Sequence, residues 1–179
     1  IYTSTMKINV ISDLHLEFAD LELPGGDVLI LSGDVCEAKH VKAEYDVNCI
    51  LNEGGPSTGN FKRSDRYTRF FHEECTKYNK VFYVAGNHEH YHGDYATSAG
   101  YLRDTMKQCG DNIHFLDKEV WEHEDHVFIG GTLWTDMNGE DEMTMNHVSR
   151  RMNDFQICKN SNRMASYRTW EAVLDADGN

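Results

Sequence analysis

Hydrophobic and polar positions follow two alternating patterns along the chain. Runs rich in β-branched and aromatic residues predict buried strands at 6–12, 27–32 and 80–85. Shorter runs of the same kind predict strands at 113–116, 119–121 and 127–129. Between and after these strands, the apolar spacing indicates helices at 65–79, 97–109, 142–153 and 162–174.

This order of elements predicts the fold class. Strands that alternate with helices are typical of an α/β layered domain, whose functional site lies at the carboxyl ends of the strands. The segment 37–65 contains the sequence GGPSTGN, and we expect it to be an exposed loop inserted in the domain. We expect one domain over 6–179, preceded by an unpatterned N-terminal extension at 1–5.

Composition narrows the functional classes. The 179 residues include 30 acidic and 17 basic ones, for a net charge of −13, which disfavours a long nucleic acid as partner. No apolar stretch approaches the length of a membrane span, so no membrane association is expected. The five cysteines are odd in number and lack paired spacing, which indicates reduced thiols and a cytoplasmic location.

Polar side chains that could bind a metal follow the first three predicted strands. Asp13 and His15 follow the first strand, Asp34 follows the second after a glycine, and Asn87 and His88 follow the third. Taken singly, each group is equally typical of an ordinary turn. If the strands are neighbours in one sheet, these side chains meet at its edge. Such a mixture of Asp, His and Asn suits a borderline divalent metal, and Asp34 in the middle could bridge two ions.

The motifs D-x-H, GD and GNHE, in this order and each after a strand, resemble those of the calcineurin-like metallophosphoesterase superfamily. The sequences TLWTDM at 132–137 and MNDF at 152–155 resemble those of a bacterial and phage subgroup of predicted phosphoesterases. The resemblance implies a β-sandwich flanked by helices, in four layers αββα. It also implies a dinuclear metal centre at one edge of the sandwich.

The resemblance further assigns roles to single residues. Asp13 and His15 would hold the first metal, Asp34 would bridge, and Asn87 would hold the second. His88 would not bind a metal and would act as a general acid or stabilise charge on the phosphoryl group. A metal-bridging hydroxide would attack the phosphorus of a phosphomonoester or phosphodiester. The expected cofactors are two divalent ions, with Mn²⁺ favoured over Fe, Zn, Ni or Mg.

The sequence departs from the family pattern near its end. The family continues with a lone ligating histidine and then a Gly-His-x-His motif, and neither pattern occurs here. We therefore expect a C-terminally truncated domain whose last strands are missing. The alternative function is that of an inactive or split-gene fragment that needs a complementary C-terminal segment for activity. We expect His90 and His92 to be exposed loop residues or to lie on the substrate side.

The expected substrate is a small-molecule or nucleotide phosphoester. Four late arginines could meet its phosphate or form a solvated helix face: Arg150, Arg151, Arg163 and Arg168. Tyr91 could stack on an organic leaving group, whereas Trp134 is expected to pack in the core. Glu37 could support the site or be a solvated charge.

Overall fold

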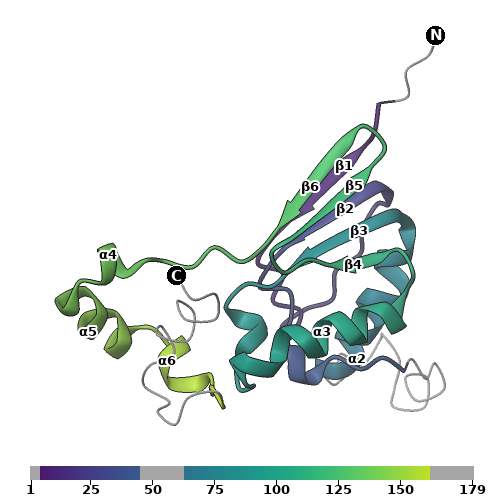
Figure 1. Ribbon diagram of the computed structural model, residues 1–179. Helices are drawn as coiled ribbons and strands as arrows, with labels where there is room; N and C mark the ends of the chain where they lie inside the picture. The colour runs from purple at the N-terminus through teal and green to yellow at the C-terminus, as the bar shows by residue number, and fades with distance from the viewer. Residues whose placement is uncertain (1–4, 45–62, 162–179) are drawn as a thin grey trace.

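A four-stranded parallel sheet forms the centre of the computed structural model, which describes residues 5–44 and 63–161. The strands are β1 (Ile8–Ile11), β2 (Gly26–Ser32), β3 (Tyr78–Val84) and β4 (Ile113–Phe115), and they lie side by side in that order (Figure 1). Residues Ile8 to Ile11 pair with Val28 to Leu31, and the register of β2 on β3 continues to Ser32 and Val84. The carboxyl ends of β1, β2 and β3 therefore meet at one edge.

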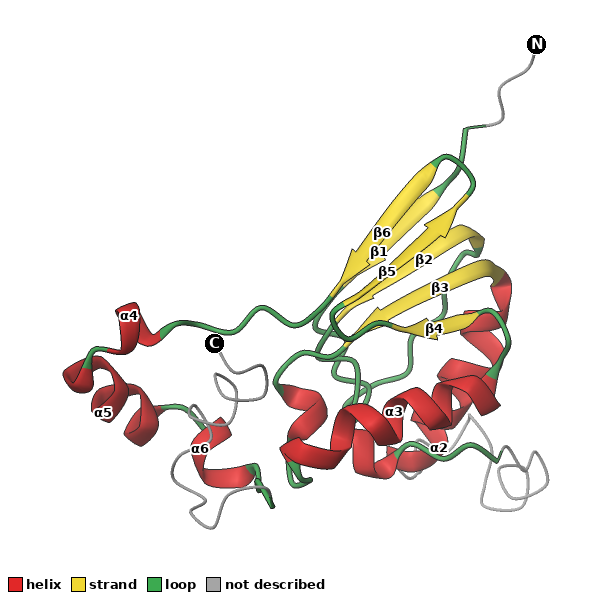
Figure 2. Ribbon diagram, viewed as in Figure 1, coloured by secondary structure: helices red, strands yellow, loops and turns green. Residues whose placement is uncertain are grey.

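Helices cover one face of this sheet (Figure 2). They are α2 (Arg63–Arg69), the π-helical turn η3 (Phe70–Glu74), the 3₁₀ turn η4 (Cys75–Lys77) and α3 (Tyr95–Cys109). Alternate residues of the strands face them, so Leu29, Leu31, Val81 and Tyr83 belong to the main core. Asp94 caps α3 by accepting a hydrogen bond from the Ala96 amide at 3.0 Å.

An antiparallel hairpin covers part of the opposite face. It consists of β5 (Glu119–His123) and β6 (His126–Gly130). Phe128 of the hairpin stacks on Phe82 of β3, with ring centroids 4.3 Å apart. Phe82 belongs to a smaller core cluster with Val28 and Leu116. Helices, sheet and hairpin thus form three successive layers.

The outer face of the hairpin is apolar and exposed. Val120, Val127 and Ile129 alternate with the inward Trp121 and Phe128, and they are 61%, 60% and 82% exposed. No helix or strand among the described residues covers these three side chains.

The last described part of the chain extends away from the sheet (Figure 1) and then contacts the loop before α3. It contains α4 (Met137–Glu140), α5 (Glu142–Arg151), which buries no residue, and α6 (Asp154–Ile157). The segment from α6 onward attaches to the start of α3, where the Tyr95 amide donates to the Lys159 carbonyl at 2.8 Å. This contact places the MNDF sequence near the loop that follows β3. The short 3₁₀ turns η1 (Ala38–His40) and η5 (His88–His90) lie in the loops after β2 and β3.

The α/β fold class is confirmed, and all six predicted strands occur close to their expected positions. The helix predicted at 65–79 is wrong at its end, because Tyr78 pairs with Gly26 and begins β3. The helix predicted at 162–174 and most of the loop at 37–65 lie outside the described residues. Among the described helices, none is long and apolar enough to cross a membrane.

Candidate metal centre and active site

The loops after β1 and β2 remain joined beyond the ends of the strands. The Asp13 amide donates to the Gly33 carbonyl at 3.1 Å, and the His15 amide donates to the Asp34 carbonyl at 3.0 Å. Asp13, His15 and Asp34 have left-handed backbone conformations, with φ of 56°, 44° and 53°. Such conformations are uncommon outside glycine and cluster at functional sites. The backbone is bent here so that three side chains point to the same edge.

The loop after β3 lies directly against the loop after β2. A Cβ atom added to Gly33 would lie 2.7 Å from the Gly86 amide nitrogen, so only glycine allows this approach, and Gly33 also has a φ of +91°. The His88 amide donates to Asp34 Oδ1 at 2.9 Å. One carboxylate oxygen of Asp34 is thereby fixed.

Glu89 connects the loops after β2 and β3 through hydrogen bonds to both. Its side chain is fully buried and accepts hydrogen bonds from the amides of Asp34 (3.0 Å), Val35 (2.7 Å) and Gly86 (2.7 Å) and from the Tyr83 hydroxyl (2.7 Å). Burial raises the pKa of Glu89, and the hydrogen bonds from Tyr83, Val35 and Gly86 oppose that shift. Glu89 is the last residue of the GNHE motif, and no role was predicted for it from the sequence. Its only signal in the sequence was its place in the loop after a buried strand, which does not distinguish it from an ordinary acidic residue.

Asp13, His15 and Asp34 form the first group of candidate metal ligands. One ligand atom of each lies within 4.8 Å of the others. Two carboxylates and an imidazole are donors that manganese, iron or zinc accept, and the site is open to solvent on the side of Asp13. The residues present fit a divalent cation.

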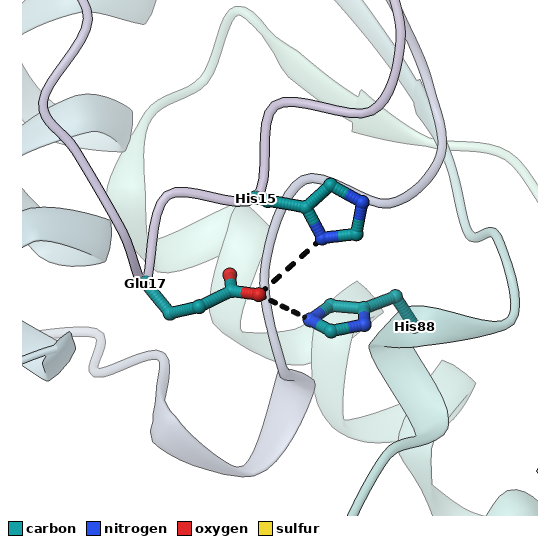
Figure 3. A group of neighbouring side chains, drawn as sticks. All are labelled: His15, Glu17 and His88. Carbon is teal, nitrogen blue, oxygen red and sulfur yellow. Dashed lines mark hydrogen bonds and ion pairs between the residues drawn. The ribbon is translucent and has the colours of Figure 1, made fainter. Parts of the chain in front are cut away.

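His15, Glu17 and His88 form a second group, shown in Figure 3. The carboxylate oxygen Glu17 Oε1 lies 2.7 Å from His88 Nε2 and 3.3 Å from His15 Nδ1. Glu17 is buried, and the two imidazole rings meet edge to face at 4.5 Å. A buried carboxylate therefore lies against the imidazole of His88. Sequence reasoning missed Glu17, although it stands two residues after His15.

Asn87 lies at the start of η5, next to His88. Its amide nitrogen Nδ2 donates to the Tyr91 hydroxyl at 3.2 Å, and that hydroxyl donates to Asp154 Oδ2 at 3.3 Å. The side chain that the sequence predicted as a second-metal ligand is therefore held by hydrogen bonds on the side of its nitrogen.

Residues 6–172 match the family model of the calcineurin-like phosphoesterases. The chain belongs to this family. A protein of Acanthamoeba polyphaga mimivirus, named "Uncharacterized protein L509", is 30% identical over 156 residues, which are 85% of this chain and 51% of the viral protein. The chain thus spans about half the length of this relative.

The calcineurin-like phosphoesterases are a family of metal-dependent phosphoester hydrolases. In this chain, the Asp13–His15–Asp34 group supplies donors for a divalent metal. The structure therefore brings Asp13, His15 and Asp34 together, and it places His88 and Asn87 at the same edge.

Several neighbouring residues lie elsewhere than expected. His90 is buried, at 4% exposed, and packs against Tyr95 and Trp134, so the expectation of an exposed loop residue is wrong. Burial lowers the pKa of His90 to about 4, and the Asp154 charge opposes that shift. His92 is more exposed, and its Nδ1 lies 3.3 Å from Glu37.

Glu37 is neither solvated nor a support for the metal group. Its buried carboxylate accepts from Arg63 Nη1 at 2.8 Å and lies 3.2 Å from His40 Nε2. Glu37 therefore links the loop after β2 to α2. Arg150 and Arg151 lie exposed in α5, and Arg163 and Arg168 lie outside the described residues.

Proposed function

We propose that this chain hydrolyses a phosphomonoester or phosphodiester at the edge formed by the loops after β1, β2 and β3. The observation that supports this most is the convergence of Asp13, His15 and Asp34 within 4.8 Å at the strand ends of a calcineurin-like phosphoesterase. When bound there, divalent ions supply charge that lowers the pKa of a water molecule and offsets the negative charge of the phosphoryl group. We propose two ions and expect manganese, with iron, zinc, nickel or magnesium as alternatives.

Each side chain at the edge has a proposed task. Asp13 and His15 would hold the first ion, Asp34 would offer its carboxylate to both ions, and Asn87 would hold the second through its amide oxygen. His88 gives a proton to the leaving-group oxygen. Glu17, 2.7 Å from His88 Nε2, is a positioning residue that holds the imidazole toward the substrate.

A small-molecule or nucleotide phosphoester is the proposed substrate class. The net charge of −13 would repel the backbone of a long nucleic acid, and a short substrate needs only the local positive charge at the edge. Cys36, Cys75, Cys109 and Cys158 are buried and unpaired, which supports a cytoplasmic location for the reaction.

A second proposal concerns the completeness of the site. The chain spans about half of its viral relative and contains no Gly-His-x-His sequence. The remaining ligands of the second ion would then come from a complementary C-terminal segment. In that case this chain alone binds the first ion and hydrolyses phosphoesters slowly or not at all.

Metal binding and hydrolysis, measured together, test both proposals. Manganese binding is followed by calorimetry, and hydrolysis by release of nitrophenol from p-nitrophenyl phosphate and bis-p-nitrophenyl phosphate. Asp34→Asn is expected to weaken manganese binding at least about tenfold and to abolish hydrolysis, because it removes a ligand charge. Asp125→Asn removes the same charge from the exposed turn of the hairpin and is expected to change neither.

The outcomes separate the proposals. Equal manganese affinity in wild type and Asp34→Asn would overturn the metal site. Manganese binding without hydrolysis, with hydrolysis restored by a longer chain, would favour the need for a complementary segment.

A further inference from the structure

Three polar side chains form a chain of hydrogen bonds that leads away from the candidate metal centre. Asn87 Nδ2 lies 3.2 Å from the Tyr91 hydroxyl, which lies 3.3 Å from Asp154 Oδ2. Asn87 and Tyr91 are on either side of η5, whereas Asp154 begins α6 and belongs to the MNDF sequence. Asp154 is only 7% exposed.

The chemistry of the last member sets the direction of both hydrogen bonds. The Tyr91 hydroxyl donates its one hydrogen to Asp154 Oδ2, because a carboxylate oxygen accepts. The hydroxyl can then only accept from Asn87.

This direction decides which end of the Asn87 amide faces Tyr91. The oxygen and nitrogen of an asparagine amide are similar in size, so packing alone does not distinguish them. Because Tyr91 can only accept, the amide must present its NH₂ group to Tyr91. Oδ1, the only atom of that amide with a lone pair for a cation, is therefore directed away from Tyr91.

We propose that Tyr91 and Asp154 are positioning residues that fix the amide of Asn87 with its oxygen available to a cation. The part that concerns the cation rests on the proposed function, and the orientation of the amide does not. Without Tyr91, the amide rotates freely and spends part of its time with NH₂ toward the cation, which repels it.

Backbone contacts keep Asp154 in reach of Tyr91. The His92 amide donates to the Ile157 carbonyl at 3.1 Å, and the Lys159 amide donates to the Gly93 carbonyl at 3.0 Å. These bonds attach α6 to the loop that carries Tyr91. The MNDF sequence is remote from Tyr91 along the chain. It thus contributes to the site through a single carboxylate, that of Asp154, which accepts from the Tyr91 hydroxyl.

The orientation is tested first in metal-free protein, by NMR of the full 179-residue chain labelled with ¹⁵N. The side-chain NH₂ signals of Asn87 are identified by their loss in Asn87→Asp. In wild type, one hydrogen of this NH₂ group is expected to be shifted downfield and to exchange slowly with water. Tyr91→Phe is expected to remove both properties. Tyr101→Phe deletes a hydroxyl of α3 that donates to the Val41 carbonyl, and it is expected to leave the Asn87 signals unchanged.

Manganese titration then measures the consequence for binding. Loss of an outer partner of a metal ligand typically weakens binding 10- to 100-fold. Tyr91→Phe and Asp154→Ala are expected to weaken the second manganese ion by this factor and to leave the first ion unchanged. Asp154→Asn is expected to recover part of the affinity, because its amide oxygen still accepts from Tyr91. A purely structural role would weaken both ions together.

Two results overturn the proposal. Asn87 signals that are unchanged in Tyr91→Phe would show that the hydroxyl does not orient the amide. Altered signals with equal affinity for the second ion would show that the orientation does not serve a cation. If the wild type binds no manganese, the proposed function fails, and if it binds only one ion, the part of the proposal that concerns the cation fails. In either case the NMR comparison still supports or overturns the orientation of Asn87.

Discussion

The two faces of the parallel sheet bury different amounts of apolar side chain. On the helix-covered face, residues of β2 and β3 join a large core with Phe71 and Leu102, which are fully buried. On the hairpin-covered face, the buried cluster contains Val28, Phe82 and Leu116, and the hairpin packs against it through half-buried Trp121 and Phe128.

This difference shows which face supports the candidate site. Tyr83 points to the helix-covered face and donates to Glu89, which in turn holds the loops after β2 and β3. The position of Asp34 therefore depends on the larger core. The hairpin contacts the site edge through Thr132 just beyond it, whose hydroxyl donates to the Ala85 carbonyl at 2.6 Å.

The largest expected effect comes from a matched pair of truncations, one for each face. Phe71→Ala is expected to lower the free energy of unfolding by about 3 to 5 kcal/mol, because it leaves a cavity in the main core beside Tyr83. Phe128→Ala is expected to cost about 1 to 2 kcal/mol, because its ring is only partly buried. Urea denaturation of both variants measures the difference. Equal losses would contradict the ranking of the two faces.

A smaller loss of stability is expected at low pH, because His90, on the side of the larger core, becomes protonated. Burial lowers the pKa of His90 to about 4, so the unfolded chain binds a proton at a pH where the folded chain does not. Its contribution to stability is complete above its ordinary pKa near 6.5 and is lost as the pH falls toward 4, by up to roughly 3 kcal/mol.

Denaturation at pH 7 and pH 5 in the presence of a chelator measures this dependence. His90→Phe keeps a ring beside Tyr95 and Trp134 and removes the titration, so its stability is expected to fall less between the two pH values. The same slope in both proteins would assign the acid sensitivity to other groups.

The smallest effect is expected on the outer face of the hairpin. Ile129→Thr keeps a β-branched residue at a position that is 82% exposed, so the free energy of unfolding is expected to change by less than about 0.5 kcal/mol. Thermal unfolding of the full chain measures it. A loss above about 1 kcal/mol would show that this side chain is covered in solution, and the contrast between the faces would then be smaller.

Patterns that depend on neighbouring residues were predicted well from the sequence. The continuous apolar run at 27–32 forms β2, one of the two inner strands of the sheet. The motifs after β1, β2 and β3 lie at the expected edge. The predicted end of the helix at 65–79 was wrong because the apolar ring of Tyr78 suits a helix as well as a strand. Its pairing with Gly26, remote in sequence, decided for the strand.

Contacts between remote segments account for what sequence reasoning missed at the site. Glu17 and Glu89 look like ordinary acidic residues in the sequence, and only their burial against His88 and the Asp34 amide reveals their roles. The burial of His90 also depends on contacts between remote segments, because α3 and the segment around Trp134 enclose it.

The sequence by itself determined the α/β class, the succession of the strands along the chain and the residue types available at the strand ends. These follow from apolar periodicity and from the chemistry of single side chains, which are local properties. Only the tertiary structure decided which carboxylates are buried, which imidazole faces Glu17, and which end of the Asn87 amide is held by Tyr91. Those depend on the direction and distance of groups that the fold brings together from separate loops and from α6.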